Sequence, residues 1–348
     1  MKHWLALLLN FFLLQGCTKP ESPGAGAGAS SGNAYLDSSG RVDALSGGAR
    51  LISINTPKGK FNVWTKRVGN NPTTKVLLLH GGPGATHEYF EAFDSYFPGA
   101  GIEYYYYDQL GSANSDAPDD PSLVDLPRYV EEVEQVRIAL GLDKSNFYLL
   151  GHSWGGILAT EYALKYQQNL KGMIISNMMV SIPAYNAYAK KVLIPAMDPK
   201  VVAEIYALEV AKDYDNPRYM ELLVPNFYTQ HILRMPADQW PDPVNRAFAK
   251  LNKKVYIPMQ GPSEMGASGK LENWDRVADL PKITVPTLSI AGTHDTMDPV
   301  HMEMIAKTVQ KGRYLLCKQG SHMSMYDDQK TYFTGLIQFI KDVDASRL

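Results

Sequence analysis

The sequence has few cysteines: Cys17 and Cys317 are the only two in 348 residues. Two cysteines are too few for a disulfide framework or a zinc cluster. Charge of one sign is also lacking, because 34 Lys and Arg residues nearly balance 36 Asp and Glu residues and give a formal net charge of −2. A chain without a basic excess lacks the electrostatic footprint of a nucleic-acid binder. We therefore expect no nucleic-acid partner.

A hydrophobic run long enough to cross a bilayer is missing too. The apolar run at residues 4–14 follows the basic start Met1-Lys2-His3 and is interrupted only by Asn10. A membrane-spanning helix needs about 20 apolar residues. The shorter run with its basic start is typical of a cleaved export signal.

The apolar run ends in Leu14-Gln15-Gly16-Cys17, which resembles the bacterial lipoprotein signal. The resemblance implies that residues 1–16 are removed and that Cys17 becomes the lipidated first residue. The protein would then be exported and anchored by its lipid to a membrane of the bacterial cell envelope. Because Thr18 follows in place of an aspartate, the resemblance implies the outer membrane or periplasm in a Gram-negative cell. An ordinary signal peptide with an incidental cysteine is the alternative.

The segment TKPESPGAGAGASSGN at residues 18–33 is rich in Gly, Ala, Ser and Pro. Such a composition cannot bury a core, so it predicts a flexible tether over residues 17–33. We divide the rest of the chain into a first core part at 34–181, an inserted cap at 182–272 and a second core part at 273–348.

Short apolar runs alternate with helical patterns through the two core parts. Continuous apolar runs, which are typical of strands buried on both faces, occur at residues 75–79, 102–107, 146–150, 171–176, 284–290 and 312–318. Residues 126–140 have helical spacing, and residues 49–54 and 60–65 alternate like an antiparallel hairpin. Strands that alternate with helices predict an α/β fold with a mostly parallel, doubly wound sheet. Cys317 falls in the last run and is expected to be a small buried hydrophobe.

The alternation breaks between about residues 182 and 272. This stretch is rich in Tyr, Pro, Met and Asn and has no strong strand pattern. It stands between two sheet strands, which predicts a helical cap inserted at the carboxyl edge of the sheet. Open α/β folds bind their ligands at that edge.

A nucleophile elbow is predicted at Gly151-His152-Ser153-Trp154-Gly155. The pattern Gly-x-Ser-x-Gly marks a tight strand-to-helix turn that presents a serine at the top of an α/β-hydrolase sheet. The pentapeptide alone is a weak pattern, but here an apolar run precedes it and a helical pattern follows it. Glycines at 151 and 155 would leave room for the turn, and Ser153 is the candidate nucleophile.

A serine nucleophile needs a general base, and in α/β-hydrolases an acid and then a histidine follow the serine along the chain. Asp295 and His322 each follow an apolar run and are the candidate acid and base. Asp298 and His294 are their rivals, but they fit the strand ends less well. The other position where this fold can place the acid holds Asn177, whose amide cannot stabilise an imidazolium as a carboxylate does.

An oxyanion hole needs two backbone N–H groups that point at the developing charge. The residue after the nucleophile, Trp154, is expected to supply one of them. The loop His80-Gly81-Gly82-Pro83-Gly84 follows the first buried run, and its glycines let the backbone approach a substrate closely. Gly82 is the candidate for the second N–H. His80 and His152 are expected to be structural.

Five motifs together resemble the proline iminopeptidase family of serine aminopeptidases. They are HGGPG at 80–84, YYDQLGSANSD at 106–116, GHSWGG at 151–156, GTHDTMDP at 292–299 and GSHMSMYDD at 320–328. The resemblance covers roughly residues 45–345 and is greatest to the branch with the tricorn-interacting aminopeptidase. It implies an α/β-hydrolase fold with a helical cap, acyl-enzyme chemistry, and no metal or cofactor.

The resemblance also implies how the α-amine of a substrate is bound. A cap carboxylate can receive a protonated amine through a charge-assisted hydrogen bond, and the family's glutamate in Gly-Pro-x-Glu corresponds to Glu264. The same branch has a second glutamate after the catalytic aspartate, but this chain has Thr296 there. Glu221 or another cap carboxylate is a candidate replacement.

Three hypotheses for function follow. The first is a serine aminopeptidase that releases an N-terminal proline or another small or apolar residue from a short peptide or amino-acid amide. The second is an amidase, esterase or lactonase on the same residues, which needs no free amine; Thr296 favours it. The third is a catalytically silent, surface-binding lipoprotein, which the intact motifs disfavour. Apart from the membrane reached through lipidated Cys17, no protein partner is expected.

Overall fold

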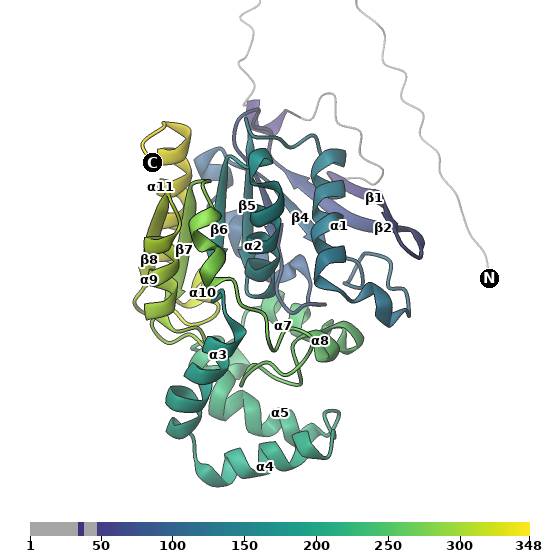
Figure 1. The fold of residues 1–348 in the computed structure, drawn as a ribbon, viewed down its shortest axis with the longest axis vertical. Coiled ribbons are helices and arrows are strands. Elements are labelled where there is room, and N and C mark those ends of the chain that lie inside the picture. The colour runs from purple at the N-terminus through teal and green to yellow at the C-terminus, as the bar shows by residue number, and fades with distance from the viewer. Residues whose placement is uncertain (1–33, 38–46) are drawn as a thin grey trace, which may run out of the picture. The chain divides into compact units, whose positions relative to one another are not determined.

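The structure is a computed structural model that describes residues 34–37 and 47–348. The expected signal sequence, nearly all of the tether and the lipidation site Cys17 lie outside the described residues. After a short 3₁₀ helix at Ala34–Leu36, the described chain forms one sheet with helices on both faces and a group of helices at one end (Figure 1).

The sheet has eight strands in the order β1-β2-β4-β3-β5-β6-β7-β8. The strands are β1 (Ala49–Thr56), β2 (Gly59–Val68), β3 (Lys75–Leu79), β4 (Glu103–Asp108), β5 (Phe147–His152), β6 (Gly172–Ser176), β7 (Thr287–Gly292) and β8 (Gly312–Cys317). β1 and β2 form the predicted antiparallel hairpin, β2 pairs antiparallel with β4, and all other neighbours are parallel. The predicted mostly parallel, doubly wound sheet is confirmed.

The strands lie close to the predicted runs, with one informative shift. β7 begins at Thr287 and not at residue 284, because Pro286 has no N–H to give to a neighbouring strand. Thr287 is the first residue that pairs, and its N–H donates to Lys311 O at 2.9 Å. Cys317 ends β8 and is fully buried, as predicted.

The sheet divides the core into two layers, one on each of its faces, and helices cover both layers. Tyr105 and Tyr107 of β4 pack in the layer under α1, α2 and α9, whereas Tyr104 and Tyr106 pack in the layer under α11 and the 3₁₀ helix η2 (His87–Ser95). Successive side chains of a strand point to opposite faces, so one run of tyrosines serves both layers. The four α-helices are α1 (Leu126–Ala139), α2 (Trp154–Tyr166), α9 (Pro299–Thr308) and α11 (Gln329–Asp344).

Between β6 and β7 the chain leaves the sheet and forms the cap helices. They are α3 (Ile182–Tyr188), α4 (Pro199–Val210), α5 (Pro217–Leu223), α6 (Thr229–His231), α7 (Asp242–Ala249) and α8 (Lys253–Met259), joined by short 3₁₀ and π segments. Figure 1 shows this group at one end of the sheet, the lower end in that view. In the described part of the chain, no helix combines the length and the apolar character needed to cross a bilayer.

Candidate active site

Ser153 lies on the predicted tight turn between β5 and α2. Its φ of +57° is in the left-handed region that non-glycine residues rarely adopt. The flanking glycines make this turn possible. A Cβ on Gly151 would lie 1.9 Å from Gly155 O, and a Cβ on Gly155 would lie 2.1 Å from Leu79 O. Both positions therefore exclude any side chain.

Asp295 and His322 meet at the carboxyl ends of β7 and β8. His322 Nδ1 lies 2.8 Å from Asp295 Oδ1, and Asp295 is fully buried. The rivals have other roles. Asp298 caps α9 by accepting from Val300 N at 2.9 Å, and the carbonyl of His294 contacts His231 Nδ1 at 2.9 Å.

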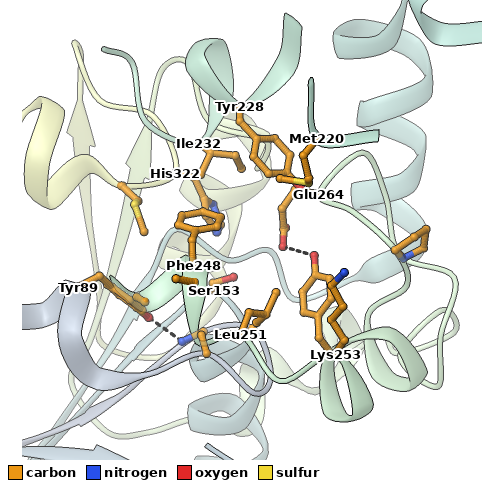
Figure 2. Close-up of a pocket in the computed structure, with 18 of the residues that line it drawn as sticks. Tyr89, Ser153, Met220, Tyr228, Ile232, Phe248, Leu251, Lys253, Glu264 and His322 are labelled. Carbon is orange, nitrogen blue, oxygen red and sulfur yellow. Dashed lines mark hydrogen bonds between the residues drawn. The ribbon is translucent and has the colours of Figure 1, made fainter. Parts of the chain in front are cut away.

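His322 and Ser153 line one cavity (Figure 2). Because Nδ1 of His322 faces Asp295, Nε2 is the nitrogen left to take a proton from a nucleophile. Burial lowers the pKa of His322, but the charge and hydrogen bond of Asp295, helped by the charge of Glu264, outweigh it and raise the pKa above its ordinary value. The site thus favours the imidazolium that forms during catalysis.

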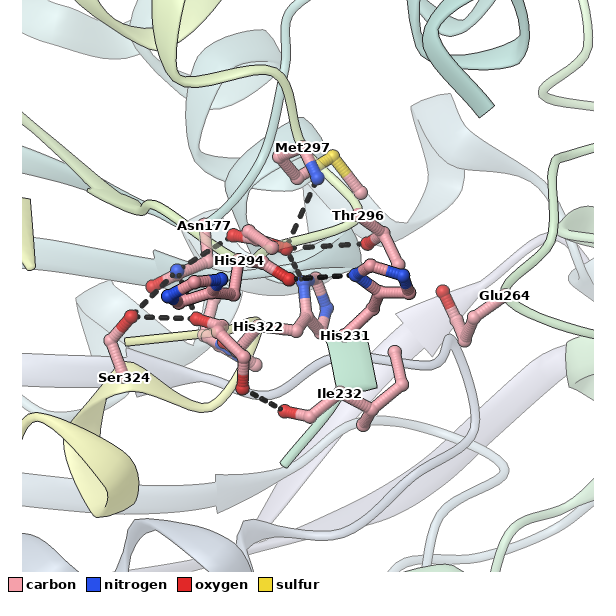
Figure 3. Close-up of polar contacts among 12 residues, drawn as sticks. Asn177, His231, Ile232, Glu264, His294, Thr296, Met297, His322 and Ser324 are labelled. Atoms are coloured by element: carbon pink, nitrogen blue, oxygen red, sulfur yellow. Dashed lines mark hydrogen bonds and ion pairs between the residues drawn. The ribbon is translucent and has the colours of Figure 1, made fainter. Parts of the chain in front are cut away.

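Asn177 holds Asp295 from the side opposite His322, a role that the sequence analysis missed. Its Nδ2 donates to Asp295 Oδ2 at 2.8 Å, and Met297 N and Thr296 Oγ1 donate to Asp295 Oδ1 at 3.1 and 3.3 Å (Figure 3). Asn177 directly follows β6, where the fold could have placed its acid. This position after β6 was the only indication in the sequence that Asn177 contacts the catalytic acid.

The loop after β3 lies against the nucleophile. A Cβ on Gly81 would lie 2.9 Å from Ser153 Cβ. The Gly81 N–H donates to the Tyr89 hydroxyl at 2.6 Å, whereas the Gly82 N–H has no acceptor within residues 34–37 and 47–348. Trp154 is the first residue of α2, where helical N–H groups have no partner within the helix. Both predicted oxyanion donors, Gly82 and Trp154, thus have an N–H without an acceptor among the described residues.

Gln109 ties this loop to α2. Its backbone N–H donates to His80 Nε2 at 3.1 Å, its side-chain amide donates to His80 O at 3.1 Å, and its Oε1 accepts from Trp154 Nε1 at 2.8 Å. Because His80 Nε2 accepts, its Nδ1 carries the proton and donates to Gly81 O at 2.9 Å. Gln109 of the YYDQLGSANSD motif therefore connects the HGGPG loop to Trp154, next to the predicted oxyanion site.

His152 is structural, as expected. Its ring nitrogens contact the Tyr89 hydroxyl at 3.1 Å and His322 O at 2.8 Å. Burial, together with the nearby His322, lowers its pKa to about 3. A neutral His152 therefore fixes the backbone of His322 without adding a charge beside Ser153.

The cavity has a volume of about 290 Å³ and mostly apolar walls. The cap contributes a largely aromatic lining of Tyr214, Tyr219, Met220, Tyr228, Phe248 and Tyr256. Such concave apolar sites with a few placed polar groups are typical of small-molecule binding. The sequence analysis located the cap but not these side chains.

Glu264 is the only carboxylate among the residues that line this cavity. Its Oε1 accepts from the Tyr256 hydroxyl at 2.6 Å, and its backbone O accepts from the Tyr185 hydroxyl at 2.6 Å. Burial raises the pKa of Glu264, and this effect exceeds the opposing effects of His322 and Tyr256. A partly buried carboxylate in the cavity of the nucleophile suits a cationic group of a ligand.

Neither Thr296 nor Glu221, the candidate replacement for the missing glutamate, lines the cavity. Thr296 is buried and turns its hydroxyl to Asp295. Glu221 does not line the cavity; its side chain is 63% exposed and lies 3.7 Å from Arg218 Nη1. Glu221 is therefore not the expected replacement. Across the described ranges, no three His, Cys, Asp or Glu side chains gather as metal ligands.

Comparison with known proteins identifies the family. The alpha/beta hydrolase fold family matches residues 74–329. A proline iminopeptidase of Flavobacterium johnsoniae is 56% identical over 298 residues, which are 86% of this chain and 100% of the relative. One from Elizabethkingia meningoseptica is 58% identical over 297 residues, 85% and 99% of the two chains. The chain belongs to the proline iminopeptidase family.

Solved structures agree with this membership in the proline iminopeptidase family. The crystal structure of the Mycobacterium smegmatis proline iminopeptidase superposes with a TM-score of 0.73 at 26% identity, covering 84% of this chain and 99% of that one. The crystal structure of VinJ gives a TM-score of 0.78, also at 26% identity, and covers 84% and 98%. The similarity to the whole length of these chains includes the cap as well as the sheet, and the predicted α/β-hydrolase fold with its cap is confirmed.

Proposed function

We propose that this protein is a serine aminopeptidase that releases an N-terminal proline, or another small or apolar residue, from short peptides or amino-acid amides. The observation that carries the proposal is the partly buried Glu264 carboxylate, which lines the same cavity as Ser153 and His322. The relatives that match over almost their whole length are named proline iminopeptidases, and this supports the same activity.

The geometry provides a group for each step of acyl transfer. Glu264 binds the protonated α-amine, which places the first carbonyl of the peptide near Ser153. Ser153 Oγ attacks that carbonyl while its proton passes to His322 Nε2, and Asp295 stabilises the imidazolium. The N–H groups of Gly82 and Trp154 stabilise the oxyanion.

Collapse of the tetrahedral intermediate breaks the C–N bond. His322 returns its proton to the leaving amine, which departs and leaves the acyl group on Ser153. Water then attacks the ester carbonyl, with His322 again accepting a proton. Finally the proton returns to Ser153 Oγ and the free amino acid leaves.

A test compares arylamides of proline, alanine and leucine with free and with acetylated amines. We expect hydrolysis of the free-amine substrates only, since an acetylated amine carries no charge for Glu264 to bind. Glu264→Gln should lower kcat/KM by about 30-fold or more, because the loss of a charge partner that the bound substrate would shield from water costs about 2 kcal/mol or more. Glu221→Gln is the matched control, because that cap carboxylate is exposed and outside the cavity.

The alternative is a hydrolase that needs no free amine. Thr296 favours it, because this residue leaves the cavity with one carboxylate and not two. Equal rates on acetylated and free substrates, with Glu264→Gln unaffected, would establish the alternative in place of the aminopeptidase.

We also propose that the protein is exported and held at the bacterial envelope, in the outer membrane of a Gram-negative cell, by a lipid on Cys17. The support is the sequence Leu14-Gln15-Gly16-Cys17 after the apolar run. Mass spectrometry of the mature N-terminus tests it. A diacylated or triacylated Cys17, and release from the membrane in Cys17→Ser, are expected; cleavage elsewhere would contradict the proposal.

A further inference from the structure

Lys253 is the only ammonium group among the residues that line the cavity. It is the first residue of α8, and its side chain is 54% exposed. A residue that both lines the cavity and reaches solvent lies where the cavity opens. In the view of Figure 2, Leu251 lies between Ser153 and Lys253. The cavity thus combines one anionic side chain, Glu264, with one cationic side chain, Lys253.

Lys253 pairs with Asp215, which lies in the loop between α4 and α5. Asp215 does not line the cavity, although its neighbour Tyr214 does. The side chain of Asp215 is 88% exposed. Ion pairs this exposed contribute at most about 1 kcal/mol, because water screens both partners. Another carboxylate can therefore replace Asp215 on Lys253, and the freed Asp215 returns to water at little cost.

We propose that Lys253 binds the C-terminal carboxylate of a short peptide substrate and sets a preference for free peptides over amides and over longer chains. The inference rests on the proposed aminopeptidase function. A short peptide carries a cationic amine and an anionic carboxylate on either side of its first carbonyl. The cavity that contains Ser153 presents the complementary charges, Glu264 and Lys253. Lys253 would act on binding and not on bond cleavage, so its replacement should raise the KM for free peptides and leave kcat unchanged.

The test compares Pro-Gly with Pro-Gly amide as substrates of the full-length protein. The wild type should cleave the free acid with a kcat/KM roughly 3- to 5-fold higher than that of the amide, the fold-change that one exposed ion pair supports. Lys253→Met should bring this ratio to about one, and Lys253→Glu should reverse it. Asp215→Asn removes the competing carboxylate and should increase the ratio. Because each ratio is measured on one preparation, a partly folded variant does not distort it.

Lys254→Met is the matched control. Lys254 is the next residue, is 75% exposed, pairs with Asp119 and does not line the cavity, so this variant should keep the wild-type ratio. A wild-type ratio near one, or a ratio unchanged in Lys253→Met, would overturn the role of Lys253. Hydrolysis of proline arylamide, which has no carboxylate, tests the proposed function separately. If the wild type does not cleave that arylamide, both the proposed function and this inference fail.

Discussion

Asn177 acts on the chemistry through Asp295 and has no contact with the cavity. Its Nδ2 also donates to Ser321 O at 3.0 Å, in the residue before His322. The amide thus fixes the acid and the loop of the base together. Its φ of +54° is one that asparagine tolerates better than most residues.

We expect Asn177→Ala to lower kcat by about 10-fold with little change in KM, because a misplaced Asp295 orients His322 less well. Steady-state kinetics check this, and the pH profile separates the role from a loss of folding. A freed Asp295 should shift the pH at which kcat falls on the acidic side of the profile. Partial unfolding would only lower kcat by the same factor at every pH. An unchanged kcat would exclude the positioning role.

His322 determines how the rate of hydrolysis falls at low pH, the acidic limb of the pH–rate profile. Only neutral His322 can accept the serine proton, and its pKa is raised above the ordinary 6.5. Activity should therefore be lost as the pH falls through a pKa above 6.5. Glu264→Gln removes a negative charge that raises this pKa, so the limb should move to lower pH. The pH dependence of inactivation by a fluorophosphonate measures this without an amine on the probe.

Glu221→Gln serves as the control for this titration and should leave the limb in place. A limb that does not move in Glu264→Gln would mean that the two side chains do not interact electrostatically, in conflict with their shared cavity.

At the scale of elements, the junction of β5 with α2 depends on the absence of side chains. Gly155→Ala would place a Cβ against Leu79 O of β3, and the helix would have to move from the sheet. Overpacking of this kind costs about 1–3 kcal/mol, so we expect a lower urea midpoint and a large loss of activity. Gly99→Ala is the matched control, because nothing lies within 4 Å of its added Cβ; equal stability of the two variants would contradict this account.

The elements were largely predictable because buried parallel strands leave a strong pattern of continuous apolar residues. Ser153, Asp295 and His322 were predictable for a related reason, since each follows such a strand. The side chains around them were not. The contacts of Asn177 with Asp295 and of Tyr185 with Glu264 join segments that are distant in the chain and have no shared periodicity.

At the scale of the whole molecule, charged groups join the cap to the core. Arg246 of α7 contacts Glu88 and Glu91 of η2, at 2.5 and 2.7 Å, and Lys250 contacts Glu88 at 2.6 Å. The Glu88 side chain is only 7% exposed. Because α7 supplies Ala247 and Phe248 to the cavity wall, these ion pairs position one side of the substrate site.

We expect Glu88→Ala to raise KM several-fold with a smaller effect on kcat, because the cap wall loosens while Ser153 and His322 stay in place. Removing the largely buried Glu88 side chain and its hydrogen bonds also costs stability, by about 1–3 kcal/mol, which thermal unfolding measures. Asp242→Ala is the control. Asp242 also pairs with Arg246, but it lies within α7 and is 79% exposed, so the same effect from both variants would contradict a role in docking the cap.

The burial of Cys317 has a practical consequence for following the cap in solution. Its thiol is fully enclosed at the end of β8, and burial raises its pKa, so maleimides that require an exposed thiolate will not label it. With Cys17 replaced, a new cysteine placed on α4 would be the only site that takes a fluorophore or a spin label. The native sequence is thus almost a cysteine-free background for spectroscopy, in which a single substitution reports on cap motion during turnover.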